Sequence, residues 1–409
     1  MQTTTLAAPK TERIQLIDSL RGFALFGILI AHITYWFTAG ALPGEVYQKF
    51  EGLGFQIAGA FEGILVSGKF YTFFSFLFGV SFALQMSSKD FTIGRFLWRL
   101  ALLGVIGLIH SAHWRGDILS IYTVVGLVLV LFRNSSDKVL VAVAFLMILN
   151  LPIRIKGLLD TLNPAPPPSA QQQKADEQKN KEFYQMLKSG SYTDILKASV
   201  PAFAEKFHFQ FDSGRIYITL GYFLLGFLAG RRRWFQAFEQ HKPFFKKWLK
   251  ISGFSTLGII AIALAIGMLF GNSSEPMPWL NYFMNALYDV HCMMLTFFYI
   301  AGMAFLLQKS KWQGVARALS YVGRMALTSY LGQTFIGIIL FYGIGFGLVG
   351  EINPGYCLLM TFPVFALQVV MSRWWLSKFN YGPIEWLWRS GTQLRWQPLK
   401  RHEESNLAT

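Results

Sequence analysis

The chain has 409 residues, of which 53% are hydrophobic and only 14% are charged, and its formal net charge is +15. Soluble domains carry roughly 25% charged residues, so this composition excludes an ordinary soluble globular protein and is typical of a chain that crosses a membrane many times. The two cysteines, Cys292 and Cys357, are too few for a disulfide framework or a zinc site.

Ten apolar stretches approach the length of about 20 helical residues that crosses a hydrocarbon core of roughly 30 Å. They predict an all-α fold, a polytopic integral membrane helix bundle of about ten transmembrane helices. A further re-entrant element is a candidate at 53–67, where glycine and Glu62 dilute the apolar run. The ten stretches are 14–37, 68–87, 95–113, 117–132, 138–153, 214–230, 249–271, 283–307, 321–346 and 355–376.

The segment 156–212 interrupts this series, because a proline-rich run is followed there by alternating lysine and glutamate. It predicts an extended linker and then a polar helix. The chain is therefore expected to divide into an N-terminal five-helix membrane half at 1–155, the polar loop at 156–212, a C-terminal five-helix membrane half at 213–380 and a basic tail at 381–409.

The positive residues indicate the orientation of this bundle. With ten spans, 25 of the 37 lysines and arginines fall on the side of the N-terminus, and nine of the other 12 lie between Arg154 and Arg215, in or beside the long loop. Short cytoplasmic loops retain the excess of positive charge, whereas long loops do not follow this rule. We expect a protein of the bacterial cytoplasmic (inner) membrane with both termini cytoplasmic, membrane lipids as partners and no nucleic acid.

The first span carries ionisable residues at both ends. Asp18 and Arg21 are one helical turn apart, so they either neutralise each other as an anchor or present the guanidinium to phosphate or carboxylate groups. His32 follows Arg21 by 11 residues, about 16 Å along a helix. It is a candidate general base or metal ligand, or only a hydrogen-bond donor to a backbone carbonyl.

The turn between the third and fourth spans holds the strongest cluster, His110, His113, Arg115 and Asp117. Ionisable groups at membrane depth are costly, so this cluster is a candidate functional site. Asp117 could orient an imidazole or pair with Arg115, which favours acid-base catalysis or a structural polar turn. A metal site is not expected, because a third ligand is missing nearby.

Two further ionisable residues, Asp289 and His291, fall in the outer half of the eighth span and could face the same cavity. The sequence has no phosphate-binding P-loop, no Gly-x-Ser-x-Gly turn and no dinucleotide-binding fingerprint. The expected catalytic residues are His110, His32 and Asp117. The residues expected to bind substrate or cofactor are Asp18, Arg21, Arg95, Arg99, His113, Arg115, Asp289 and His291.

Five motifs resemble one family. They are RIQLIDSLRGFALFGIL at 13–29, GKF at 68–70 ahead of FSFLFG at 74–79, GDIL at 116–119, GRMALTSYLGQ at 323–333 and YGPIEWLWR at 381–389. Together they resemble the YeiB-like family (domain of unknown function 418), and they cover most of the chain outside the 156–212 loop.

This family is similar in turn to the transmembrane acyltransferase superfamily, whose members pass an acyl group from cytoplasmic acyl-CoA to a sugar on the far side with an intramembrane histidine. The resemblance implies that Arg21, Arg95 and Arg99 bind the CoA phosphates. The spacing of Arg21 and His32 repeats that of the acyltransferase-3 arginine and histidine, but YeiB-like proteins commonly carry asparagine at the position of His32. His32 and His110 are therefore rival bases.

The resemblance implies acyl-CoA as the donor substrate and an envelope glycan or lipid-linked acceptor as partner, with no metal. Two other functions are open at this stage. A transporter or flippase would use the same ionisable groups to bind and release a substrate during alternating access. A non-catalytic envelope scaffold would use them only to join helices.

Overall fold

The computed structural model describes residues 14–89, 91–162, 169–271 and 277–401. Within these ranges the chain is all-α, and its only ladder pairing is an isolated antiparallel bridge between Phe379 and Lys400. The helices are α1 (Gln15–Thr34), α2 (Gly44–Gln48), α3 (Leu53–Phe61), α4 (Phe70–Met86), α5 (Ile93–His113), α6 (Leu119–Leu131), α7 (Asp137–Ile148), α8 (Leu151–Leu162), α9 (Ala170–Ser189), α10 (Tyr192–Asp212), α11 (Arg215–Arg231), α12 (Phe238–Phe270), α13 (Pro278–Leu306), α14 (Gln313–Arg324), α15 (Ala326–Phe341), α16 (Pro354–Lys378) and α17 (Pro383–Gln393). A π-helical turn, Glu62–Val66, follows α3, and a 3-10 turn, Ser310–Trp312, precedes α14.

Six helical segments of the described residues are long and apolar enough to cross a membrane: α1, α3 with α4, α5, α12, α13 and α16. Two bent pairs raise the number to eight if each pair crosses once. Helices α7 and α8 meet at an angle of 41°, and the 310–324 segment meets α15 at 83°. The large exposed side chains of α12, α13 and α16 are mostly apolar, as expected for helices that face lipid.

This count is lower than the ten spans predicted from hydropathy. The 117–132 stretch forms α6, whose 13 residues reach only about 20 Å. The candidate re-entrant element at 53–67 instead joins α4 in one apolar segment of 34 residues, Leu53–Met86. The 214–230 stretch forms α11, a 17-residue helix that begins and ends with arginine and is buried along nearly its whole length. At 1.5 Å per residue this helix is about 25 Å long, and its apolar faces contact protein rather than lipid.

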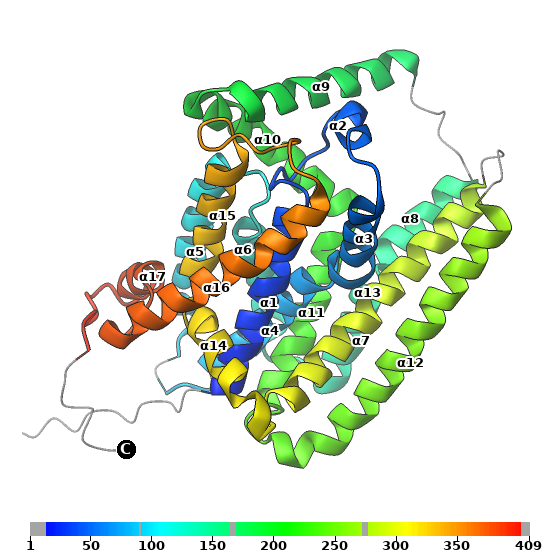
Figure 1. Ribbon diagram of the computed structural model, residues 1–409. Helices are drawn as coiled ribbons and strands as arrows, with labels where there is room; N and C mark the ends of the chain where they lie inside the picture. The colour runs from blue at the N-terminus through cyan, green and yellow to red at the C-terminus, as the bar shows by residue number, and fades with distance from the viewer. Residues whose placement is uncertain (1–13, 90, 163–168, 272–276, 402–409) are drawn as a thin grey trace, which may run out of the picture.

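Helix α11 lies at the centre of the bundle between α4, α6 and α7 (Figure 1). Glycines permit its close approach to α4. A Cβ atom at Gly226 would lie 1.9 Å from the carbonyl oxygen of Phe76, and one at Gly79 would lie 2.1 Å from that of Phe223. The backbones of α4 and α11 therefore touch directly, as small residues allow in membrane helix packing.

Alanine at Gly226 is expected to destabilise the protein by about 1–3 kcal/mol, because the added methyl group has no room between α4 and α11. The matched control is Gly258→Ala on α12, where no atom lies within 4 Å of the added Cβ. Alanine there is expected to be neutral or to stabilise by roughly 0.5–1 kcal/mol. The free energies of unfolding, measured by denaturing-detergent titration, test this, and equal values for the two variants would contradict the close packing.

The 156–212 segment contains two helices beyond α8, where the sequence predicted one polar helix. Figure 1 shows α9 lying across one end of the bundle, with α10 beneath it. Capping boxes at Ser169 and Ser191 begin the two helices. Helix α10 packs against α5 and α11, with Ile195 and Ala202 buried. The predicted linker at 163–168 lies outside the described residues. The end of the bundle that α9 and α10 cover is called the α10 side below.

Candidate functional site

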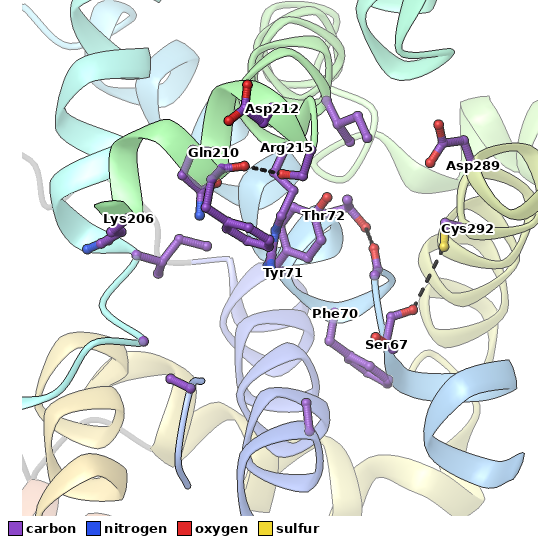
Figure 2. Close-up of a pocket in the computed structure, with 18 of the residues that line it drawn as sticks. Ser67, Phe70, Tyr71, Thr72, Lys206, Gln210, Asp212, Arg215, Asp289 and Cys292 are labelled. Carbon is purple, nitrogen blue, oxygen red and sulfur yellow. Dashed lines mark hydrogen bonds between the residues drawn. The ribbon is translucent and has the colours of Figure 1, made fainter. Parts of the chain in front are cut away.

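A cavity of about 1140 Å³ lies beneath α10, between the second half of α1, the start of α4, the α5–α6 turn, α11 and α13 (Figure 2). Its lining is mixed, with aromatic and aliphatic side chains between polar ones, as in binding pockets for small molecules. The histidine and the acidic and basic residues that line it are His32, Arg115, Asp117, Arg154, Glu205, Lys206, Asp212, Arg215 and Asp289.

His32, near the end of α1, lines this cavity and also a smaller pocket of about 230 Å³. Its ring is held between aromatic rings, with centroids 4.6 Å from Trp114 and 5.0 Å from Phe37. The Nδ1 atom is buried and has no hydrogen-bond partner among the described residues. A buried imidazole nitrogen without a partner costs free energy, so it is more informative about function than a satisfied one.

The backbone directly after α1 is strained. Trp36 and Phe37 have φ angles of 56° and 59°, in the left-handed region that bulky residues rarely occupy. Two indole hydrogen bonds hold this turn: Trp36 Nε1 donates to the Ile352 carbonyl at 2.8 Å, and Trp114 Nε1 donates to the Phe37 carbonyl at 2.8 Å. Strain maintained in this way is common beside functional sites, and here it fixes the rings around His32.

Asp117 is the centre of a buried network in the wall of the cavity. One carboxylate oxygen is 2.9 Å from Nδ1 of His110 and accepts the backbone N–H of Leu119. The other accepts hydrogen bonds from Lys206 Nζ at 2.8 Å and from the Ser120 hydroxyl at 2.6 Å. The Asp117 side chain is fully buried and that of Lys206 is 8% exposed, so the network joins the α5–α6 turn to α10.

The charges of this network stabilise each other. Burial alone would raise the pKa of Asp117, but the hydrogen bond with His110 and the charge of Lys206 lower it well below the ordinary value. Burial lowers the pKa of the Lys206 ammonium, and Asp117 opposes that shift. The carboxylate therefore stays ionised at neutral pH and holds the lysine in place.

The two rival histidines have different environments. Both ring nitrogens of His110 are engaged, Nδ1 with Asp117 and Nε2 with the Thr334 hydroxyl at 2.8 Å, and His110 does not line the cavity. Trp114 lies near both imidazoles, with its ring centroid 4.6 Å from that of His32 and 5.7 Å from that of His110. The two histidines are thus close together, but only His32 faces the space where a substrate fits.

The other two residues of the predicted cluster diverge. His113 does not line the cavity. Its Nδ1 donates to the Ile109 carbonyl at 2.7 Å, and its ring faces Tyr192 of α10. Arg115 lines the cavity, with its guanidinium 4.1 Å from the ring centroid of Phe183. Asp117 pairs with His110 and Lys206 rather than with Arg115.

Asp289 and His291 lie on α13 but face different surroundings. Asp289 lines the cavity and forms an ion pair with Arg154 at 2.6 Å. His291 does not line the cavity, and its Nε2 donates to the Ile64 carbonyl at 2.8 Å, beside the π-helical turn. Figure 2 shows Asp289 and Cys292 on the same side of the cavity, across from Lys206 on α10.

The predicted donor-binding arginines lie toward the other end of α1. Arg21 Nη1 donates to Asp18 at 2.8 Å and Nη2 donates to the Ser81 hydroxyl at 2.7 Å. The Arg99 guanidinium stacks on the Trp388 ring of α17 at 3.7 Å. Arg95 is exposed in the first turn of α5. The residues predicted to bind substrate or cofactor therefore do not form one site. Asp18, Arg21, Arg95 and Arg99 lie apart from the predicted residues that are near the cavity.

Sequence reasoning missed Lys206 and Arg215 as site residues. Lys206 falls in the polar 156–212 segment, where nothing distinguishes it from other lysines of that segment. Arg215 is the last positive residue before an apolar stretch, and in the sequence it contributes only to the count of positive charges that indicates the orientation. Within the described ranges, no group of three histidine, cysteine, aspartate or glutamate side chains is arranged to hold a metal ion.

These features define a helical membrane protein with a cavity of mixed polar and apolar lining on one side and a buried histidine that faces it. The chain belongs to the DUF418 family, "Protein of unknown function (DUF418)", whose family model matches residues 229–395.

The similarity to whole relatives extends over nearly the full length. The chain is 30% identical to the uncharacterized protein YxaH of Bacillus subtilis, over 95% of this chain and 96% of that protein. It is 27% identical to the uncharacterized protein YeiB of Escherichia coli, over 93% of this chain and 96% of that protein. No solved structure matches the chain. The resemblance to the YeiB-like family is therefore confirmed.

Proposed function

We propose that the protein is an acyltransferase of the bacterial cytoplasmic membrane that moves an acyl group from cytoplasmic acyl-CoA to a hydroxyl acceptor in the cavity on the α10 side. The observation that carries this proposal is His32, an imidazole that lines the cavity and whose Nδ1 has no partner among the described residues. A general base has to reach the proton that it removes, and His32 meets this requirement better than His110.

The proposed step needs one base and no oxidant. Neutral His32 takes the proton of the acceptor hydroxyl, and the oxygen attacks the thioester carbonyl. The carbon–sulfur bond then breaks, the acyl group becomes an ester of the acceptor, and the CoA sulfur takes the proton from the imidazolium. The His110–Asp117–Lys206 network has a positioning role in this scheme, because it holds the turn that carries Trp114 against His32.

Arg21, Arg95 and Arg99 are proposed to bind the donor. Guanidinium groups bind phosphate through paired N–H donors, and these three lie near the opposite end of the bundle from α10. Arg21 precedes His32 by 11 helical residues, about 16 Å along α1. In this arrangement the charged part of the donor binds near the cytoplasmic surface, and the acyl group extends toward His32.

Calorimetry of acetyl-CoA and palmitoyl-CoA with the purified protein tests the donor site. Wild type is expected to bind at least one of these donors, and His32→Ala is expected to bind that donor with the same affinity. The affinity of Arg21→Ala is expected to be lower by about 10-fold or more, because a phosphate contact is lost. Lys311→Ala, an exposed cation elsewhere, is the control. Wild type that binds neither donor would contradict the proposal and leave transport as the stronger alternative.

The proposed topology places α9 and α10 outside the cell and both termini in the cytoplasm, with α6 and α11 crossing inside the bundle in addition to the lipid-facing spans. A cysteine introduced at Gln172 is therefore expected to react with an impermeant maleimide in whole cells, because this residue is exposed on α9. A cysteine at Lys311 is expected to react only after lysis. The native Cys292 and Cys357 are buried and add little background. Labelling of the Gln172 variant only after lysis would invert the orientation.

A further inference from the structure

The cationic side chains around the cavity are not equivalent. Arg154 pairs with Asp289, and Lys206 pairs with Asp117. Arg115 stacks on Phe183 and lies near Glu205. Neither Arg115 nor Arg215 has a carboxylate of the described residues within 4.0 Å of its guanidinium, but Arg115 donates to the Ala198 carbonyl at 3.5 Å, whereas the contacts of Arg215 are with aromatic rings.

Arg215 is nevertheless held firmly in place. Its guanidinium lies 4.4 Å from the ring centroid of Tyr71 and 5.8 Å from that of Phe209. A guanidinium has five N–H donors in a planar fork, and ring faces do not accept them as a carboxylate does, so these donors are available to a ligand. Figure 2 shows Asp212, the nearest acidic residue along the chain, directed away from the Tyr71 ring.

Two other features add to the attraction for an anion. Arg215 is the first residue of α11, so the positive end of the helix dipole lies at the same point. Arg215 and His32 also line the same cavity. A ligand bound by Arg215 therefore occupies the space that the imidazole faces.

We infer that the acceptor carries a negatively charged group, a phosphate or a carboxylate, which Arg215 binds while an acceptor hydroxyl lies at His32. This inference rests on the proposed function for the role of the hydroxyl, but the anion site itself does not depend on catalysis. Guanidinium recognises both anions by paired hydrogen bonds, and the anionic group belongs either to a lipid headgroup or to a soluble phosphorylated or acidic sugar.

Binding to the full-length protein in phosphatidylcholine nanodiscs, without any acyl donor, tests this site. The soluble probes are glucose 1-phosphate, glucuronate and neutral glucose, titrated by calorimetry. The lipid probe is phosphatidylglycerol added to the nanodiscs and measured by native mass spectrometry. Wild type is expected to bind at least one anionic probe about 10-fold or more tightly than glucose or phosphatidylcholine. Binding of the lipid alone would identify a headgroup as the source of the anion.

Arg215→Gln is expected to abolish this preference, and Arg215→Lys to retain part of it, because lysine keeps the charge but not the fork. Lys197→Gln, an exposed cation on α10 outside the cavity, is expected to bind like wild type. If Arg215→Gln does not fold, the conservative variant decides: its affinity for the anionic probe is expected to fall about 3- to 10-fold, and an unchanged affinity overturns the inference.

Wild type that binds glucose and the anionic probes equally, or binds none of them, also overturns it. Because no donor is present, an Arg215-dependent preference supports the anion site even if acyl-CoA binding is absent. In that case the acyltransferase proposal fails separately.

Discussion

Replacement of His32 by alanine is expected to reduce acyl transfer by about 10²- to 10⁴-fold, the usual effect of losing a general base. Binding of acyl-CoA is expected to stay unchanged, because Arg21, the proposed donor arginine of the same helix, lies about three helical turns away. The measurement is transfer of labelled acyl groups by the purified variant, alongside calorimetry of the donor.

Two other histidine variants make this result specific. His113→Ala is the matched control, since His113 lies at the same end of the bundle but outside the cavity. It is expected to transfer at close to the wild-type rate. His110→Ala is expected to lose stability more than chemistry, because its imidazole bridges Asp117 and Thr334. A stable His110→Ala protein with no activity, together with an active His32→Ala protein, would reverse the assignment of the base.

Asp117→Ala is expected to destabilise the protein by about 3–5 kcal/mol, because it leaves the buried Lys206 ammonium without its carboxylate. It also removes the partner of His110 and the acceptor for the N–H of Leu119 at the start of α6. Denaturing-detergent titration of the two proteins at pH 7 measures the difference. Asp176→Ala, an exposed aspartate on α9, is the control and is expected to change stability little.

The same pair gives a pH dependence with a definite sign. The pKa of Asp117 is lowered in the folded protein, whereas an unfolded aspartate titrates at about 3.9. Ionised Asp117 therefore contributes its full stabilisation above that pH, and the contribution falls as the pH drops from there through the lower folded pKa. The stability difference between wild type and Asp117→Ala is expected to stay constant from about pH 5 to 7 and to shrink in stronger acid. A difference that grows with acidification would contradict the ion pair.

Much of the fold was accessible from the sequence, because the solvent of the bundle imposes long apolar helices. The prediction of an all-α membrane bundle is confirmed. Which helices face lipid was less accessible, since the apolar faces of α11 contact protein, and a hydropathy window does not separate such contacts from lipid contacts. The 13-residue α6 is strongly apolar but too short to cross a bilayer unaided.

The candidate site was accessible only where its parts are close in sequence. His110 and Asp117 lie seven residues apart on either side of one turn, so their contact was one of the two pairings that the sequence left open for Asp117. The pairing of Asp117 with Lys206 joins residues 89 positions apart, and nothing in the polar segment specified it. Which histidine faces the cavity was also undetermined, because α1 is apolar on most of its surface and its periodicity does not identify a single face.

Transfer from the cytoplasmic face in inverted membrane vesicles tests the proposed reaction most directly. Vesicles from cells that express the chain expose the cytoplasmic side and retain the native acceptors, so acyl-labelled acetyl-CoA or palmitoyl-CoA can be added outside. With wild type, label from one of these donors is expected in the glycan or lipid fraction. The amount of label incorporated by His32→Ala vesicles is expected to be at least about 10²-fold smaller. Equal incorporation by both, or none by either while the wild-type vesicles take up or release solute, would contradict acyl transfer through His32.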